Sequence, residues 1–177
     1  MERIKNLIAA LELCIPELEI APLYANLPVN TENDTVLEWL YQHLTEQNLM
    51  FYEEWKEYNG YIPELKPLAN LTITEEPADF IFSLIEQIDW STSVISSYEL
   101  IYVIPWLEHI NFYLKPHSVR LIDLMPFENA YILCVRDNEE LLEVLNSSLE
   151  EFGISINERC MMDRQQVSDS IESMITG

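Results

Sequence analysis

Glycine is scarce in this sequence, and its scarcity excludes several large classes of enzyme. The 177 residues include only three glycines, Gly60, Gly153 and Gly177, which lie far apart. Loops that cradle phosphates need clustered glycines, because the backbone amides must approach the phosphate oxygens closely. The Gly-x-Ser-x-Gly motif of serine hydrolases is missing as well. We therefore expect neither a nucleotide-dependent enzyme nor a common serine hydrolase, and we expect no cofactor.

Basic residues are also scarce. Nine Lys and Arg stand against 31 Asp and Glu, which gives a net charge of −22, and the acids are spread along the chain without forming an acidic tail. Direct binding to DNA or RNA needs a basic patch that neutralises phosphates. We therefore expect no direct contact with nucleic acid. The natural complement of such a negative surface is a basic protein.

Long apolar runs and paired cysteines are missing too. The longest apolar run, residues 100–107, is far shorter than the roughly 20 residues that span a bilayer. Charged residues interrupt the N-terminal apolar pattern, unlike in a signal peptide. Cys14, Cys134 and Cys160 are an odd number without close spacing, which indicates free thiols in a reducing compartment. We expect a soluble cytoplasmic protein without a membrane partner, and a buried, inert Cys134.

The sequence does contain enough apolar material, 49% of its residues, for one domain with a sizeable core. Apolar residues recur at helical spacing along the first two thirds of the chain. The predicted helices are one that ends at Pro16, one that starts near Asp34, one over 77–89 with Thr74 as its N-cap, and one over 105–114 that restarts or kinks at Pro105. The inner face of the second helix is expected to comprise Val36, Leu37, Leu40, Tyr41 and Leu44. Residues 49–57 are rich in aromatics and predict a strand.

The last third of the chain predicts a strand–strand–helix–strand unit. The expected elements are strands over 118–124 and 130–136 joined by a short hairpin loop, a helix over 138–152 and a strand over 154–156. Asp137 and Glu140 suit a capping box at the start of that helix, and Gly153 suits the left-handed position after it. We expect an α+β fold in which N-terminal helices pack on a small mixed β-sheet. Residues 1–177 then form a single domain, with 157–177 as a peripheral helical tail.

Residues 98–156 resemble a bacterial domain family of unknown function. The resemblance comprises a helix that ends in the stretch HINFYL, a strand that contains LID, a second strand with an aromatic residue, and an acid-rich helix. It covers about a third of the chain, implies an α+β fold and supplies no catalytic residue. In size and acidity the whole chain is also similar to bacterial immunity proteins, although no motif carries that likeness.

One segment combines aromatic and acidic residues around a turn, as a surface for a basic partner would. The residues of this segment that we expect to contact a partner are Glu53, Glu54, Trp55, Glu57 and Tyr58. Aromatic rings supply rigid contact area, and carboxylates supply charge complementarity. The alternative is that Trp55 and Tyr58 pack inward while the glutamates simply face solvent. Glu139 and Glu143, on the outer face of the C-terminal helix, form a second candidate group.

Metal-binding and carboxylate motifs are weak. Glu108-His109 does not continue into a two-histidine helical motif, and no stretch has the acid spacing of a calcium loop. We expect His43, His109 and His117 to be ordinary, partly exposed histidines. Adjacent acids such as Glu139 and Glu140 point in different directions on a helix or strand, so they do not make a catalytic pair. We therefore expect no metal site and no enzymatic activity.

The leading hypothesis is an acidic binding protein, specifically a bacterial immunity or inhibitor protein that occludes a basic toxin domain, for example a nuclease. Three alternatives stay open. The first is a DNA mimic that blocks DNA-binding proteins, and the second is a carboxylate- or metal-dependent enzyme whose residues converge from distant segments. The third is a housekeeping domain that is merely acidic and has no partner.

Overall fold

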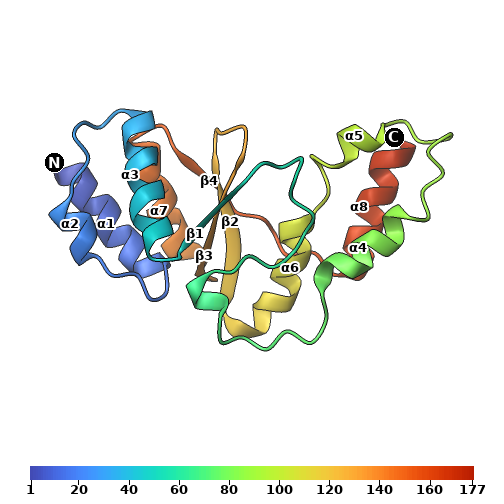
Figure 1. The fold of residues 1–177 in the computed structure, drawn as a ribbon, viewed down its shortest axis with the longest axis horizontal. Coiled ribbons are helices and arrows are strands. Elements are labelled where there is room, and N and C mark those ends of the chain that lie inside the picture. The colour runs from blue at the N-terminus through green and yellow to red at the C-terminus, as the bar shows by residue number, and fades with distance from the viewer.

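A four-stranded antiparallel β-sheet lies at the centre of the computed structural model, which describes residues 1–177 (Figure 1). The strands are β1 (Met50–Glu53), β2 (Val119–Met125), β3 (Ala130–Arg136) and β4 (Ser155–Asn157), in the order β1-β3-β2-β4. The α+β class is thus confirmed. The expectation of a mixed sheet is wrong, because every neighbouring pair is antiparallel. A tight hairpin joins β2 to β3, and the following helix returns the chain so that β4 runs opposite to β2.

Helices cover both faces of this sheet (Figure 1). One face carries α1 (Glu2–Cys14), α3 (Asn33–Glu46) and α7 (Glu139–Glu150), with the short α2 (Ala21–Ala25) beside α1. The other face carries α6 (Trp106–Leu114), and α4 (Pro77–Ile85), α5 (Ser97–Leu100) and α8 (Arg164–Thr176) lie beyond α6. Two 3-10 turns, η1 (Lys66–Leu68) and η2 (Lys115–His117), complete the elements. The two chain ends therefore lie at opposite ends of an elongated molecule.

Strand alternation divides the buried residues into two cores, one on each face of the sheet. In β3, Leu133 and Val135 belong to a core of 25 buried residues shared with α1, α3 and α7. The residues that alternate with them, Ile132 and Cys134, point the other way and belong to a core of 17 buried residues shared with α4, α6 and α8. Because both faces of β3 are covered, the strand is an almost continuous apolar run. Burial raises the pKa of the Cys134 thiol to about 12, which confirms the expected buried cysteine.

The C-terminal unit forms as predicted except at its helix cap. The side chain of Asn138 caps α7 by accepting a hydrogen bond from a backbone amide of the first turn. The expected capping box of Asp137 and Glu140 is wrong, because the Asp137 carboxylate accepts hydrogen bonds from Lys115 and Arg120 instead. After the helix, Gly153 has the expected left-handed conformation, with φ of 72°.

Two further boundaries differ from the sequence expectation, and a third agrees with it. β1 ends at Glu53, so residues 54–57 form a turn where a strand was expected. α4 begins at Pro77 without a side-chain cap, so the N-cap expected at Thr74 is wrong. The restart expected at Pro105 is confirmed to within one residue, since α5 ends at Leu100 and α6 runs from Trp106 to Leu114.

The segment expected to be a peripheral tail contributes to the second core. α8 buries Val167 and Ile171 there, and its last turn also accepts a hydrogen bond from the backbone of Val94 through Ile175 O. The structure thus attaches the C-terminal helix to α4 and to the loop that follows α4. None of the helices combines the length and the apolar character needed to cross a membrane.

Candidate functional site

The negative charge of this protein is largely uncompensated on the folded surface. Six of the nine basic residues form ion pairs, and together they engage seven of the 31 carboxylates, which leaves 24 without a basic partner. Arg136 is a basic residue outside these pairs, and it donates to the carbonyls of Glu12 and Leu13 at the end of α1. A surface of this kind attracts cationic groups and repels polyanions.

The aromatic residues of the predicted partner segment face inward. Tyr58 is only 3% exposed, and its hydroxyl donates a hydrogen bond of 2.7 Å to the carbonyl of Tyr61. Trp55 is half-buried beneath the guanidinium of Arg159, which lies 5.0 Å from the ring centroid. The alternative stated from the sequence, inward packing of these two rings, is therefore what the structure contains. Tyr58 offers no surface to a partner.

The glutamates of the same segment differ in what they contact. The hydroxyl of Tyr61 donates to the carboxylate of Glu53 over 2.9 Å, so Glu53 is part of the local packing. Glu54 forms an ion pair of 3.1 Å with Lys56. Glu57 is exposed and has no basic partner. Only Glu54 and Glu57 present charge outward, and one of these charges is already paired.

The two predicted groups do not form one surface. Glu53 lies opposite Ala130, the first residue of β3, whereas Glu139 and Glu143 follow the last residue of that strand. Seven strand residues at about 3.3 Å each place these ends roughly 20 Å apart. Glu139 is moreover bonded to Arg120 over 2.6 Å, and Glu143 is exposed without a partner.

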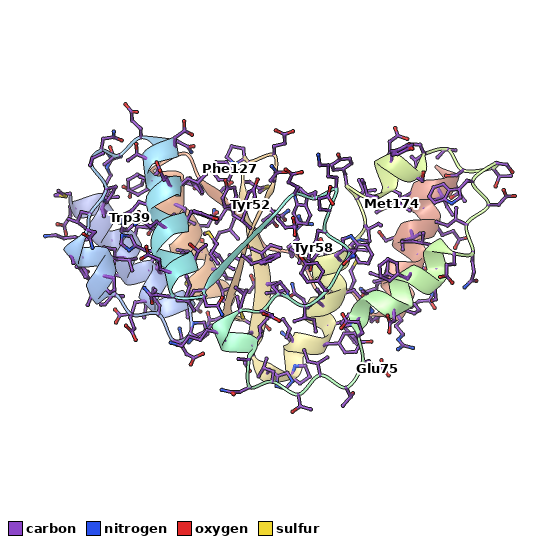
Figure 2. The ribbon with its side chains drawn as sticks, viewed as in Figure 1. Trp39, Tyr52, Tyr58, Glu75, Phe127 and Met174 are labelled. Atoms are coloured by element: carbon purple, nitrogen blue, oxygen red, sulfur yellow. The ribbon has the colours of Figure 1, made fainter.

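Four aromatic side chains meet at the edge of the sheet that β1 forms, and we call them the tyrosine cluster. They are Tyr41 from α3, Tyr52 from β1, Tyr131 from β3 and Phe127 from the β2–β3 hairpin. The ring centroids of Tyr52 and Tyr131 are 5.1 Å apart, and those of Phe127 and Tyr131 are 5.3 Å apart. Figure 2 shows Tyr52 and Phe127 at the same end of the sheet.

The tyrosine cluster is partly exposed, and its rings contact one another. Tyr41 is 40% exposed and Tyr52 is 38% exposed, and the Asn129 amide donates to the hydroxyl of Tyr52. The expectation that Tyr41 belongs to the inner face of its helix is wrong, because its ring packs on the two tyrosines at the edge of the sheet. Two exposed acids without a basic partner are close to the cluster in sequence: Glu38 lies one helical turn before Tyr41, and Glu128 directly follows Phe127.

Sequence reasoning missed the tyrosine cluster because its members come from three separate segments, namely α3, β1 and the β2–β3 hairpin. No local motif joins them, and only the register of β1 with β3 sets Tyr52 opposite Tyr131. The alternation of β1 held a partial signal: Met50 and Tyr52 share one face, while Phe51 and Glu53 share the other. Tyr52 follows the buried Met50 on the same face of β1, near the end of the strand, where a side chain is more often exposed to solvent.

Two of the three histidines are buried, which corrects the expectation that all are partly exposed. His109 is completely enclosed, with Nδ1 3.1 Å from the carbonyl of Met162, and burial lowers its pKa. His43 is 5% exposed, whereas His117 is exposed. No group of three or more His, Cys, Asp or Glu side chains is arranged to hold a metal ion.

A buried ionic cluster lies between the sheet and α6. Arg159 donates to Asp123 on β2 over 2.6 Å and to Glu108 on α6 over 3.0 Å. Burial raises the pKa of Asp123 by more than the neighbouring guanidinium lowers it. Since Asn111 also donates to the carbonyl of Arg159, these contacts hold the segment between β4 and α8 against the core. Every one of these contacts is internal, so the cluster is structural.

Comparison of this chain with protein-family models, with curated proteins and with solved structures found no match. The likeness of residues 98–156 to a bacterial domain family stays a prediction. The function of this protein is therefore inferred from its own surface, where the tyrosine cluster and the unpaired carboxylates are the prominent features.

Proposed function

We propose that this protein is an acidic inhibitor that binds a basic protein, and specifically a bacterial immunity protein that occludes a basic toxin domain in the cytoplasm without catalysing a reaction. The observation that carries the proposal is the set of 24 carboxylates that have no basic partner on the folded body. Toxin domains that act on nucleic acid need cationic clefts to hold phosphates. An acidic protein that fills such a cleft competes directly with the substrate.

The tyrosine cluster is the part of the surface best suited to the centre of such an interface. Tyrosine supplies a large contact area at a low cost in side-chain entropy, and it accepts the flat guanidinium of arginine on its ring. Glu38 and Glu128 add charge beside the rings. An aromatic centre with acids around it matches the usual anatomy of a tight interface with a basic partner.

The proposed mechanism is steric and electrostatic. The negative field of the whole surface raises the rate of encounter with a cationic protein, and the effect falls as salt screens the charges. The aromatic contacts then slow dissociation, because they form only after the two surfaces have docked. Inhibition follows from covering the cleft, so no side chain of this protein has to react.

The test begins with capture of partners from the native host by the tagged protein, at low salt and then at high salt. A captured basic protein is next purified, and its affinity for this chain and its own activity are measured as salt increases. We expect one partner, inhibited at a molar ratio of one to one, with a dissociation constant that rises with salt. Binding to many unrelated DNA-binding proteins, in competition with DNA, indicates a DNA mimic instead. Absence of any saturable partner contradicts the proposal.

The charged residues selected from the sequence are tested in the same assay. One variant neutralises Glu53, Glu54 and Glu57 to glutamine, and a second neutralises Glu139 and Glu143. Because the two groups lie at opposite ends of β3, a partner of ordinary size centred on the tyrosine cluster responds mainly to the first variant. If neither variant alters the affinity or its salt dependence, both groups lie outside the interface.

A further inference from the structure

A cavity of about 370 Å³ lies between α3 and residues 26–29. Trp39 holds this segment in place, since its indole nitrogen donates a hydrogen bond of 2.6 Å to the carbonyl of Asn26. The labelled position of Trp39 in Figure 2 is on the side of α3 away from Tyr52. The cavity is therefore a second feature of α3, and Glu38, which lines it, is the one residue that it shares with the surroundings of the tyrosine cluster.

A buried histidine without a partner borders this cavity. His43 is 5% exposed, and its ring meets the ring of Trp39 edge-on with centroids 5.8 Å apart. Neither ring nitrogen has a hydrogen-bond partner in the protein. Nδ1 is the nitrogen that is completely buried. Polar atoms at buried positions are almost always paired, so an unpaired imidazole beside an open cavity indicates a missing ligand.

The remaining walls of the cavity combine acceptors with apolar surface. Glu38, Gln42 and Glu46 follow one another at intervals of four residues, so they share one face of α3. The Gln42 amide donates to Glu46 over 3.3 Å, which leaves the amide oxygen of Gln42 and the carboxylate of Glu38 free to accept. Leu27 and Pro28 supply the apolar wall. No lysine or arginine lines the cavity.

We propose that this cavity binds the side chain of one arginine or lysine from a partner protein. Such a side chain has an apolar stem and a cationic end. The stem fits against Leu27, Pro28 and Trp39. The cationic end donates hydrogen bonds to the carboxylate of Glu38, beside the unpaired ring of His43, and such charge-assisted bonds are stronger than neutral ones.

Naming a partner's side chain as the occupant rests on the proposed function, whereas binding of the cationic group itself does not. A free polyamine has the same ammonium chemistry, but it lacks the peptide backbone that a protein partner would place at the mouth of the cavity. A volume of about 370 Å³ is at the small end of ligand pockets. That size suits one long side chain.

The experiment is a titration of the isotope-labelled protein followed by NMR at the indole of Trp39, the ring of His43 and the side-chain amide of Gln42. The probes are N-acetyl-arginine amide, N-acetyl-lysine amide and the neutral N-acetyl-citrulline amide, with spermidine as the polyamine probe. We expect saturable shifts with the two cationic amides, at dissociation constants on the order of millimolar. The citrulline derivative should not bind.

A matched pair of variants identifies the charges that matter. E38Q/E46Q should weaken binding of the arginine probe by at least about tenfold, because it removes charge-assisted contacts. E2Q/E12Q removes the same charge from exposed positions on α1 and should leave binding within about twofold of the parent, since surface charges act weakly at a distance in salt. Thermal unfolding of both variants confirms that each is folded.

Three results overturn this inference. They are the absence of a saturable shift with either cationic amide, equal shifts with citrulline, and equal losses in the two variants. If spermidine binds and the amides do not, the occupant of the cavity is a polyamine and not a protein side chain. Saturable binding of the cationic amides would support the cavity proposal even if no basic partner is captured. Capture of a basic partner would support the proposed function even if the amides do not bind, so the two proposals can fail separately.

Discussion

Arg159 and Asp123 form a buried ion pair that ties the segment between β4 and α8 to the central sheet. The Nε atom of Arg159 is 2.6 Å from Oδ1 of Asp123, and the two residues are separated by 36 positions in sequence. Both side chains are mostly inaccessible to water, with 19% and 6% of their surfaces exposed. The guanidinium also lies on the ring of Trp55. Arg159 therefore joins three segments that no local motif connects.

The first prediction concerns the replacement of Arg159 by methionine. R159M should lower the free energy of unfolding by about 3 to 5 kcal/mol, because it leaves the carboxylate of Asp123 buried without its counter-charge. Urea denaturation at pH 7 measures the loss. R3M is the matched control, since Arg3 and Glu151 form an exposed pair of 3.8 Å, and it should cost less than about 1 kcal/mol.

The double variant D123N/R159M tests the assigned cause. If the cost of R159M comes from an unpaired buried charge, neutralising Asp123 in the same chain should restore part of the lost free energy. The double variant should therefore be more stable than R159M alone. A double variant whose loss equals the sum of the two single losses would mean that the two side chains do not interact.

The second prediction concerns Gly60, which has φ of 78° and lies against Trp106. A Cβ atom at this position would overlap the indole ring of Trp106. G60A should lower the free energy of unfolding by about 3 kcal/mol or more, through overpacking added to the cost of a left-handed alanine. G153A is the control, because Gly153 also has positive φ but its Cβ would lie 3.3 Å from Asn33 Nδ2, so that only a small adjustment is needed. Equal losses would show that the ring of Trp106 moves aside without cost.

Much of this fold could be predicted from the sequence, because local periodicity and turn chemistry determine it. The apolar spacing of α1, α3 and α7 and the alternation of β2 and β3 correspond to the two faces of the sheet. The left-handed conformation of Gly153 could be predicted because this glycine directly follows the predicted helix. The cap of α7 was misplaced by one residue, because Arg120, 17 positions earlier, draws the Asp137 carboxylate away from the helix end.

The candidate sites could not be predicted in the same way. The tyrosine cluster depends on which strands are neighbours, and the cavity beside Trp39 depends on where residues 26–29 return to α3. The segment that looked most like a partner surface supplies core residues instead, since Trp55 packs under Arg159 and Tyr58 is buried. An aromatic residue beside acids has the same sequence pattern in both situations, and only the tertiary contacts distinguish them.

The third prediction concerns stability at alkaline pH. Burial raises the pKa of Cys134 from the ordinary 9.0 to about 12, so the folded state holds this proton more tightly than the unfolded state does. The corresponding stability is fully present below pH 9 and is lost as the pH rises towards 12, up to about 4 kcal/mol. Urea denaturation between pH 8 and 11 should therefore show a falling free energy of unfolding. C134A should reduce that fall without abolishing it, because burial also raises the pKa of Cys14 to about 11. C160A, at an exposed position, should leave the fall unchanged, and an unchanged slope in C134A would assign the fall to other groups.

The last prediction tests the tyrosine cluster as the centre of the partner interface. Y52A should weaken binding of the captured basic partner by about 30-fold or more, equivalent to about 2 kcal/mol, because central aromatic residues dominate interface energies. Tyr52 is 38% exposed at the edge of the sheet, so the protein should remain folded.

Y98A is the control, since Tyr98 is 81% exposed on α5, beyond α6 at the other end of the molecule. It should leave the affinity within about twofold, because it removes a ring of equal size from outside the interface. Most of the loss in Y52A should appear in the dissociation rate, whereas added salt should slow association in both variants alike. If Y98A weakens binding and Y52A does not, the interface lies on the helices beyond α6. In that case the acids around the tyrosine cluster contribute only to the long-range field.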